Sequence, residues 1–182
     1  MLKYALFEYI PRRCAEYAPF ELQDTCRKIL DFKHGRKYAV RWAAEEVGRA
    51  LAAAKLQDAV LVCAPASCQR TYVRRCRTFS QMLCSSCGMT DGFSYIEVIG
   101  NRRKAHNGAA RDASLVQNVV ISSDLRGKKV LLFDDIYTTG ATSRAFIDRL
   151  QAAGAEVIGA VFLGKTRRFC SCCRQKTGCS LG

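Results

Sequence analysis

The side chains best suited to chemistry lie together in the last third of the chain. Two adjacent carboxylates, Asp134 and Asp135, follow an apolar run at 130–133 and precede a turn of hydroxyls with one glycine. An amphipathic helical pattern then begins at Ser143. The N–H groups and the dipole at a helix N-terminus attract anions, whereas carboxylates accept hydrogen bonds from a ribose diol or bind magnesium. The segment therefore predicts a site for a sugar phosphate at the end of a buried strand.

This segment resembles the phosphoribosyl-pyrophosphate (PRPP) signature of the type I phosphoribosyltransferases. It consists of Asp134, Asp135, Ile136, Tyr137, Thr138, Thr139, Gly140, Ala141 and Thr142. In that family the acids meet the ribose hydroxyls and the hydroxyl-rich loop cradles the 5′-phosphate. The resemblance therefore implies that the whole segment binds PRPP and that Asp134 and Asp135 are catalytic. The alternative is a polar strand-to-helix loop in an ordinary doubly wound sheet, in which the acids merely start a turn.

Weaker matches narrow the resemblance to the competence-protein-F (ComF)-like branch of these enzymes, over roughly residues 22–166. The short segment at 32–36 is similar to a motif that precedes a long helix in that branch, and here it precedes a long helical pattern. The run at 74–81 is similar to an arginine-rich motif of the same branch. Thr78 and Ser80 depart from the usual Gly and Asn, and the sequence lacks the paired Cys-x-x-Cys ribbon usual near the start. The acceptor of the phosphoribosyl group therefore stays open.

An arginine-rich stretch follows the apolar run at 59–64. In type I phosphoribosyltransferases the loop after the first core strand holds pyrophosphate, and cations there stabilise the charge of the leaving group. The resemblance assigns this role to Ala66, Ser67 and Arg77. Arg74 and Arg75 could share the role or belong to a solvated helix face, where charge runs usually lie.

The distribution of apolar residues predicts an α/β fold. We expect helices at 19–32, 38–55 and 79–83 and from Ser143, and strands at 59–64, 95–99, 119–121, 130–133 and 157–163, with a long loop at 101–117. Alternating strands and helices indicate a parallel β-sheet flanked by helices, as in the type I phosphoribosyltransferases. Residues 159–166 match the P-loop pattern, but their apolar middle predicts a strand instead.

Length and composition fit a single domain, and the resemblance to the type I phosphoribosyltransferases implies a small N-terminal or hood region. The 182 residues would form a domain over 1–166, with its core from about residue 38, and a Cys-rich basic tail at 167–182. The net charge of +13 favours anionic partners, including weak non-specific binding of nucleic acid. We find no membrane-length apolar segment and no secretory signal, and therefore expect a cytoplasmic protein.

The chain contains 11 cysteines, and without a secretory signal a disulfide framework is not expected. The spacing of Cys84, Cys87, Cys170 and Cys173 is compatible with a tetrahedral zinc site that ties the tail to the domain. Reduced, unliganded thiols are the alternative.

The sequence thus predicts an enzyme that transfers the phosphoribosyl group of PRPP to a nitrogen nucleophile and releases pyrophosphate, with Mg²⁺ as cofactor. The expected partners are PRPP and a small-molecule acceptor, and a homodimer is left open. Two alternatives remain, namely a non-catalytic PRPP-binding regulator and a DNA-uptake (competence) accessory protein. For the latter we expect aromatic side chains interleaved with basic ones, and the sequence offers a little of this at Tyr72 and Phe79 and a little more at Phe169, which follows Arg167 and Arg168.

Overall fold

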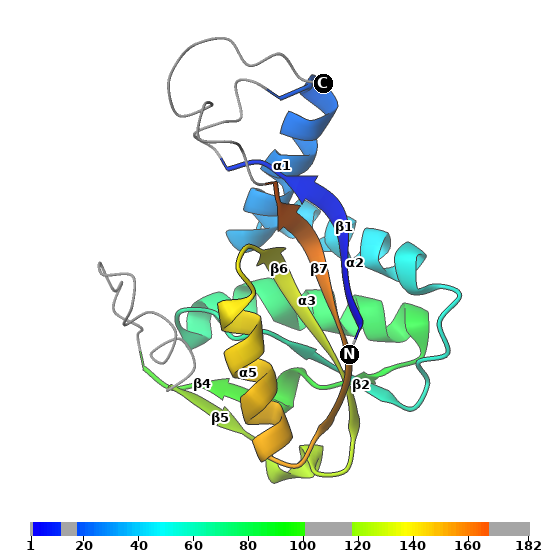
Figure 1. Ribbon diagram of the computed structural model, residues 1–182, viewed down its shortest axis with the longest axis vertical. Coiled ribbons are helices and arrows are strands. Elements are labelled where there is room, and N and C mark those ends of the chain that lie inside the picture. The colour runs from blue at the N-terminus through cyan, green and yellow to red at the C-terminus, as the bar shows by residue number, and fades with distance from the viewer. Residues whose placement is uncertain (1, 12–17, 101–117, 168–182) are drawn as a thin grey trace.

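The computed structural model describes residues 2–11, 18–100 and 118–167 and contains a parallel five-stranded sheet (Figure 1). The strand order is β1-β7-β6-β2-β3, with β1 Leu2–Tyr9, β2 Ala59–Cys63, β3 Thr90–Asp91, β6 Lys129–Tyr137 and β7 Glu156–Thr166. A separate antiparallel pair joins β4 Ile96–Val98 to β5 Val119–Ile121. The helices are α1 Phe20–Lys33, α2 Lys37–Leu51, α3 Gln69–Cys87 and α5 Ala141–Ala152, with 3₁₀ turns η2 Phe93–Tyr95 and η3 Ser123–Leu125. The predicted α/β class is confirmed.

The connections between the strands explain where a ligand can bind. The chain passes from β2 through α3 to β3, and from β6 through α5 to β7, in opposite directions across the sheet. Right-handed crossovers in opposite directions place their helices on opposite faces, and Figure 1 shows α5 in front of β6 and β7 and α3 behind the sheet. The strand order therefore reverses between β2 and β6. In open parallel sheets, the crevice at the carboxyl ends of such strands is where ligands bind.

An aromatic cluster joins the helical layer to the centre of the sheet. The ring of Phe133 on β6 lies 5.6 Å from Phe32 on α1 and 4.1 Å from Phe79 on α3, measured between centroids. All three rings are buried. Because Phe133 precedes the two acids, this packing brings the end of α1 and the middle of α3 close to the carboxyl end of β6.

Two elements extend further than the sequence pattern predicts. Strand β6 continues through both acids to Tyr137, because its pairing with β7 continues to Lys165. Helix α3 begins at Gln69, ten residues before the predicted helix at 79–83. Its first turns are rich in arginine, so the sequence pattern did not reveal their buried face, which includes Tyr72 and Arg75.

Strand β1 was not predicted from the sequence. Its first three residues are exposed, so it shows no clear alternation of apolar and polar residues, yet it pairs in parallel with β7. Residues 159–166 lie within β7, which confirms that their P-loop pattern is coincidental. The predicted loop at 101–117 lies outside the described residues, as does the predicted tail except for Arg167.

Candidate active site

A cavity of about 360 Å³ lies at the carboxyl ends of β2 and β6, at the reversal of strand order. Seven of the nine signature residues line it, namely Asp134, Asp135, Ile136, Tyr137, Thr138, Gly140 and Thr142. Thr139 and Ala141 do not line this cavity. Other elements contribute Tyr9 from β1, Lys33 from α1, Pro65 after β2, Arg75 from α3 and Ser143 from α5. The structure thus gathers most of the predicted site into one cavity.

The two acids have different surroundings. The carboxylate of Asp135 is buried and forms an ion pair with Arg75 at 3.0 Å, and Lys33 Nζ lies 3.9 Å from the same oxygen. Burial works to raise the pKa of Asp135, but the charges of Arg75 and then Lys33 outweigh it and hold the pKa below its ordinary value. Asp134 is half-buried, and the described residues place no cation within 4.0 Å of it. Burial and then the charge of Asp135 raise the pKa of Asp134 well above its ordinary value.

The loop between β6 and α5 makes a tight turn at Gly140. Gly140 has φ of 77°, in the left-handed region that favours glycine. A Cβ atom at this position would lie 2.6 Å from the ring of Tyr137. The hydroxyl of Ser143 donates to the carbonyl of Gly140 at 3.0 Å. Helix α5 begins at Ala141, and the first N–H groups of a helix have no intrahelical acceptor, so this end of the cavity suits a phosphate.

None of the three residues predicted for the pyrophosphate loop lines the cavity. Pro65 lines it, but Ala66, Ser67 and Arg77 do not. Arg77 is exposed and its guanidinium lies over the ring of Phe93, 5.3 Å from the centroid. Among the described residues, the arginine that lines the cavity is Arg75.

Two cavity residues had no strong signal in the sequence. Tyr9 belongs to β1, which local patterning did not predict, and it reaches the cavity through the pairing of β1 with β7. Lys33 lies in the segment at 32–36 that is similar to a motif of the ComF-like branch, but the sequence predicted no role for it.

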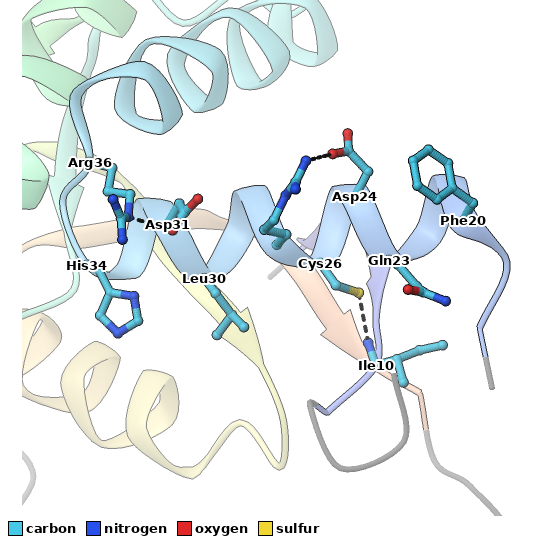
Figure 2. Close-up of a pocket in the computed structure, with 10 residues that line it drawn as sticks. Ile10, Phe20, Gln23, Asp24, Cys26, Leu30, Asp31, His34 and Arg36 are labelled. Atoms are coloured by element: carbon cyan, nitrogen blue, oxygen red, sulfur yellow. Dashed lines mark hydrogen bonds and ion pairs between the residues drawn. The ribbon is translucent and has the colours of Figure 1, made fainter. Parts of the chain in front are cut away.

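A second cavity, of about 470 Å³, runs along α1 (Figure 2). Figure 2 shows Leu30 and His34 projecting from the same side of α1, toward the side on which Ile10 lies. Asp31 and Arg36 close one end with an ion pair at 2.8 Å. Ile10 follows Tyr9 and His34 follows Lys33 in the chain, so this groove adjoins the first cavity.

The cysteines of the predicted zinc site are only partly described. Cys84 and Cys87 both lie on α3, whereas Cys170 and Cys173 lie outside the described residues. Cys84 is buried, and burial raises the pKa of its thiol to about 12, which disfavours the thiolate that zinc requires. Within 2–11, 18–100 and 118–167, no three or more His, Cys, Asp or Glu side chains form a group that could hold a metal ion. Zinc therefore stays a prediction.

Two aromatic residues of the DNA-uptake alternative are not available for stacking, and a third, Phe169, lies outside the described residues. Tyr72 and Phe79 are both fully buried in the core of the domain. These two rings therefore give the DNA-uptake alternative no support. No helix in the described part of the chain is long and apolar enough to cross a membrane.

Comparison with known proteins identifies related sequences. The family model for the phosphoribosyl transferase domain matches residues 74–168, just over half of the chain. An adenine phosphoribosyltransferase of Maricaulis maris is 54% identical over 37 residues, which cover 20% of this chain and 21% of the relative. HGPRTase-like protein 1 of Haloquadratum walsbyi is 39% identical over 32% of this chain and 35% of its own length. The chain thus spans about a fifth to a third of the length of the curated relatives it matches.

Among solved structures, a phosphoribosyltransferase from Corynebacterium diphtheriae is similar to 85% of this chain and is itself covered over 90% of its length. The two sequences are 18% identical, and the TM-score is 0.40.

Proposed function

This chain belongs to the phosphoribosyl transferase domain family, and we propose that it transfers the phosphoribosyl group of PRPP to a nitrogen nucleophile. The carbon–oxygen bond between the anomeric carbon and pyrophosphate breaks, and pyrophosphate leaves with the electron pair. A bond forms from the acceptor nitrogen to the same carbon, and the nitrogen loses its proton to water. The observation that carries this proposal is the cavity in which Asp134 and Asp135 meet the start of α5.

The parts of PRPP fit the parts of this cavity. The 5′-phosphate would bind at the turn around Gly140, where the first N–H groups of α5 and the hydroxyls of Thr138 and Thr142 can donate. The ribose hydroxyls would donate to Asp134 and Asp135. Pyrophosphate would lie toward Pro65 and the residues that follow it, including Ala66 and Ser67. Fixed charges and donors around the reacting carbon stabilise a transition state without a protein nucleophile.

Magnesium, which the family resemblance implies, suits the oxygen donors of this cavity. Asp134 has no neighbouring cation among the described side chains, so its carboxylate can contribute to a Mg²⁺ site, whereas Asp135 already contacts Arg75 and Lys33. Mg²⁺ is commonly held by one or two carboxylates together with substrate phosphates. When bound, it would neutralise charge on the pyrophosphate.

We place the acceptor in the groove along α1. In a displacement at the anomeric carbon, the entering and leaving groups lie on opposite sides of that carbon. The pyrophosphate side follows β2, whereas α1 packs on β1, β7 and β6, on the other side of the site. The mixture of Leu30, Ile10 and His34 suits a planar heterocycle with polar edges.

The ComF-like branch and the domain limits are also proposals. The run at 74–81 and the segment at 32–36 support the branch. The change of composition to Arg, Cys and Gly after Lys165 supports a domain over 1–166 with a tail at 167–182. The described residues contain nothing that favours a non-catalytic regulator or a DNA-uptake factor over an enzyme.

The test is release of pyrophosphate on incubation with PRPP, Mg²⁺ and a panel of purine and pyrimidine bases. We expect release with at least one base, and none from the variant Asp134→Asn with Asp135→Asn. The double variant should also lose at least about tenfold in PRPP affinity, about 1.4 kcal/mol. Unchanged PRPP binding by the folded double variant would contradict the assignment of the site.

A further inference from the structure

Arg75 occupies a position where the pattern of α3 calls for an apolar side chain. Tyr72, Cys76 and Phe79 form the buried stripe of this helix, and Arg75 lies in the same stripe with only 7% of its surface exposed. A buried charge without a partner is strongly unfavourable. The partner of Arg75 therefore indicates what this side chain does.

That partner is Asp135, one of the two signature acids, 60 residues further along the chain. Arg75 Nη1 donates to Asp135 Oδ2 at 3.0 Å, and the backbone N–H of Ile136 donates to Asp135 Oδ1 at 3.0 Å. Lys33 Nζ approaches Oδ2 at 3.9 Å. Groups from α3, β6 and α1 thus fix one carboxylate from three directions.

Asp134 is held differently. Its Oδ1 accepts the backbone N–H of Asp135 at 2.9 Å, and no ion pair to it occurs in the described part of the chain. Asp135 is therefore held in place by cations, whereas Asp134 can contact a ligand without breaking an ion pair, although the two acids are neighbours in the sequence.

We propose that Arg75 is a positioning residue for the sugar subsite, which holds Asp135 in the orientation that accepts a ribose hydroxyl. This inference rests on the proposed function. Each carboxylate oxygen has two lone pairs, so Asp135 can keep its present donors and still accept one hydroxyl. Arg75 is buried and already engaged, so it acts on the ribose through Asp135 and does not bind pyrophosphate itself.

The experiment uses two probes that divide PRPP into its parts, ribose 5-phosphate and inorganic pyrophosphate. Their binding, and that of PRPP, is measured by calorimetry on the full chain carrying Arg75→Met or Arg75→Lys. For Arg75→Met we expect about tenfold weaker binding of ribose 5-phosphate and of PRPP, and a change within about twofold for pyrophosphate. Arg75→Lys should restore part of the loss, since it keeps the charge without the planar fork.

The matched control is Arg49→Met, which breaks an exposed ion pair with Glu46 on α2. It should leave all three affinities unchanged. Loss of pyrophosphate binding in Arg75→Met with ribose 5-phosphate binding intact would overturn the inference, because Arg75 would then contact the leaving group directly.

A double-mutant cycle separates positioning from general loss of structure. In an Asp135→Asn background, Arg75→Met should weaken ribose 5-phosphate binding by less than about twofold further, because its effect passes through Asp135. Fully additive losses would overturn the inference.

If Arg75→Met does not fold, Arg75→Lys decides the question, and wild-type affinity for ribose 5-phosphate in that variant would refute positioning. A wild-type chain that binds ribose 5-phosphate and pyrophosphate but does not transfer would refute the proposed transfer and leave this inference standing.

Discussion

Asp134 and Asp135 are chemically identical neighbours, and the fold moves their pKa values in opposite directions. The pKa of Asp134 is raised by burial and by the charge of Asp135, so the protonated form of Asp134 stabilises the folded chain. That contribution is complete below the unfolded pKa of about 3.9 and is lost as the pH rises through the folded pKa. The pKa of Asp135 is lowered by Arg75 and Lys33, so its contribution is present above the unfolded pKa and is lost as the pH falls.

We therefore expect Asp134→Asn to stabilise the ligand-free protein while it impairs function. At pH 7 the free energy of unfolding should rise by about 1 kcal/mol, since a carboxylate in an unfavourable site is removed. The gain should shrink toward pH 4, where Asp134 of the wild-type protein is protonated. Urea denaturation at both pH values measures this effect, and PRPP titration should show affinity reduced by about tenfold.

The matched variant Asp135→Asn should behave in the opposite way at pH 7. It leaves the buried charge of Arg75 without its partner, which costs about 3 kcal/mol. Equal effects of the two substitutions on stability would contradict the difference between their environments.

At the scale of elements, the turn from β6 to α5 depends on Gly140. Gly140→Ala would force a side chain into the left-handed region, at a cost of about 1–2 kcal/mol, and place its Cβ against the ring of Tyr137. The turn should shift, and binding of both PRPP and inorganic phosphate should weaken by about tenfold. Calorimetric titration with each ligand measures the change.

Gly127→Ala is the control for that substitution. Gly127 has φ of 71° and open space around it, so alanine there brings similar backbone strain without a clash. It lies before β6, away from the cavity. Equal loss of phosphate binding in both variants would mean that general destabilisation, and not the shape of the turn, causes the effect.

Helix α1 should determine the affinity for the acceptor. Leu30→Ala removes apolar surface from the groove beside the cavity, and we expect the KM for the acceptor base to rise by about tenfold with little change in the KM for PRPP. Steady-state kinetics with each substrate varied in turn gives the two values. A rise in the KM for PRPP alone would place the acceptor elsewhere.

The elements also show what sequence reasoning can reach. The uninterrupted apolar runs at 59–64 and 130–133 predict central strands correctly, because a strand covered on both faces needs apolar side chains at every position. Strand β1 could not be predicted in this way, because it is an edge strand with exposed residues. The start of α3 could not be predicted either, because Arg75 interrupts the apolar pattern of its buried face.

In the candidate site, too, sequence patterns predict only the parts that are local in the chain. The signature at 134–142 is local, so its loop and acids could be predicted from the sequence. The contact of Arg75 with Asp135 spans 60 residues and depends on the packing of α3 against β6. Tyr9 and Lys33 likewise reach the cavity through tertiary packing, which local patterns do not encode.

At the scale of the whole molecule, the chain is strongly basic, and on α3 the positive charge lies at the surface while the aromatic rings lie inside. The net charge is +13, and Arg70, Arg74 and Arg77 are exposed along α3. Tyr72 and Phe79 of the same helix are buried, and six phenylalanines or tyrosines are among the largest fully buried side chains. This arrangement attracts polyanions through charge, and α3 offers no exposed ring on which a base could stack.

We therefore expect weak binding of single-stranded DNA that is almost purely electrostatic. Binding by charge alone releases counterions, so the logarithm of affinity should fall linearly with the logarithm of salt concentration, by about 0.7 for each phosphate contacted. Replacing Arg70 and Arg74 by alanine should reduce this slope by about 0.7 to 1.4, because each lost phosphate contact removes one such increment. Fluorescence anisotropy with labelled oligonucleotides of different sequence, at several salt concentrations, measures both quantities. Tight binding that barely responds to salt would require stacking or base contacts that the described surface of α3 does not offer.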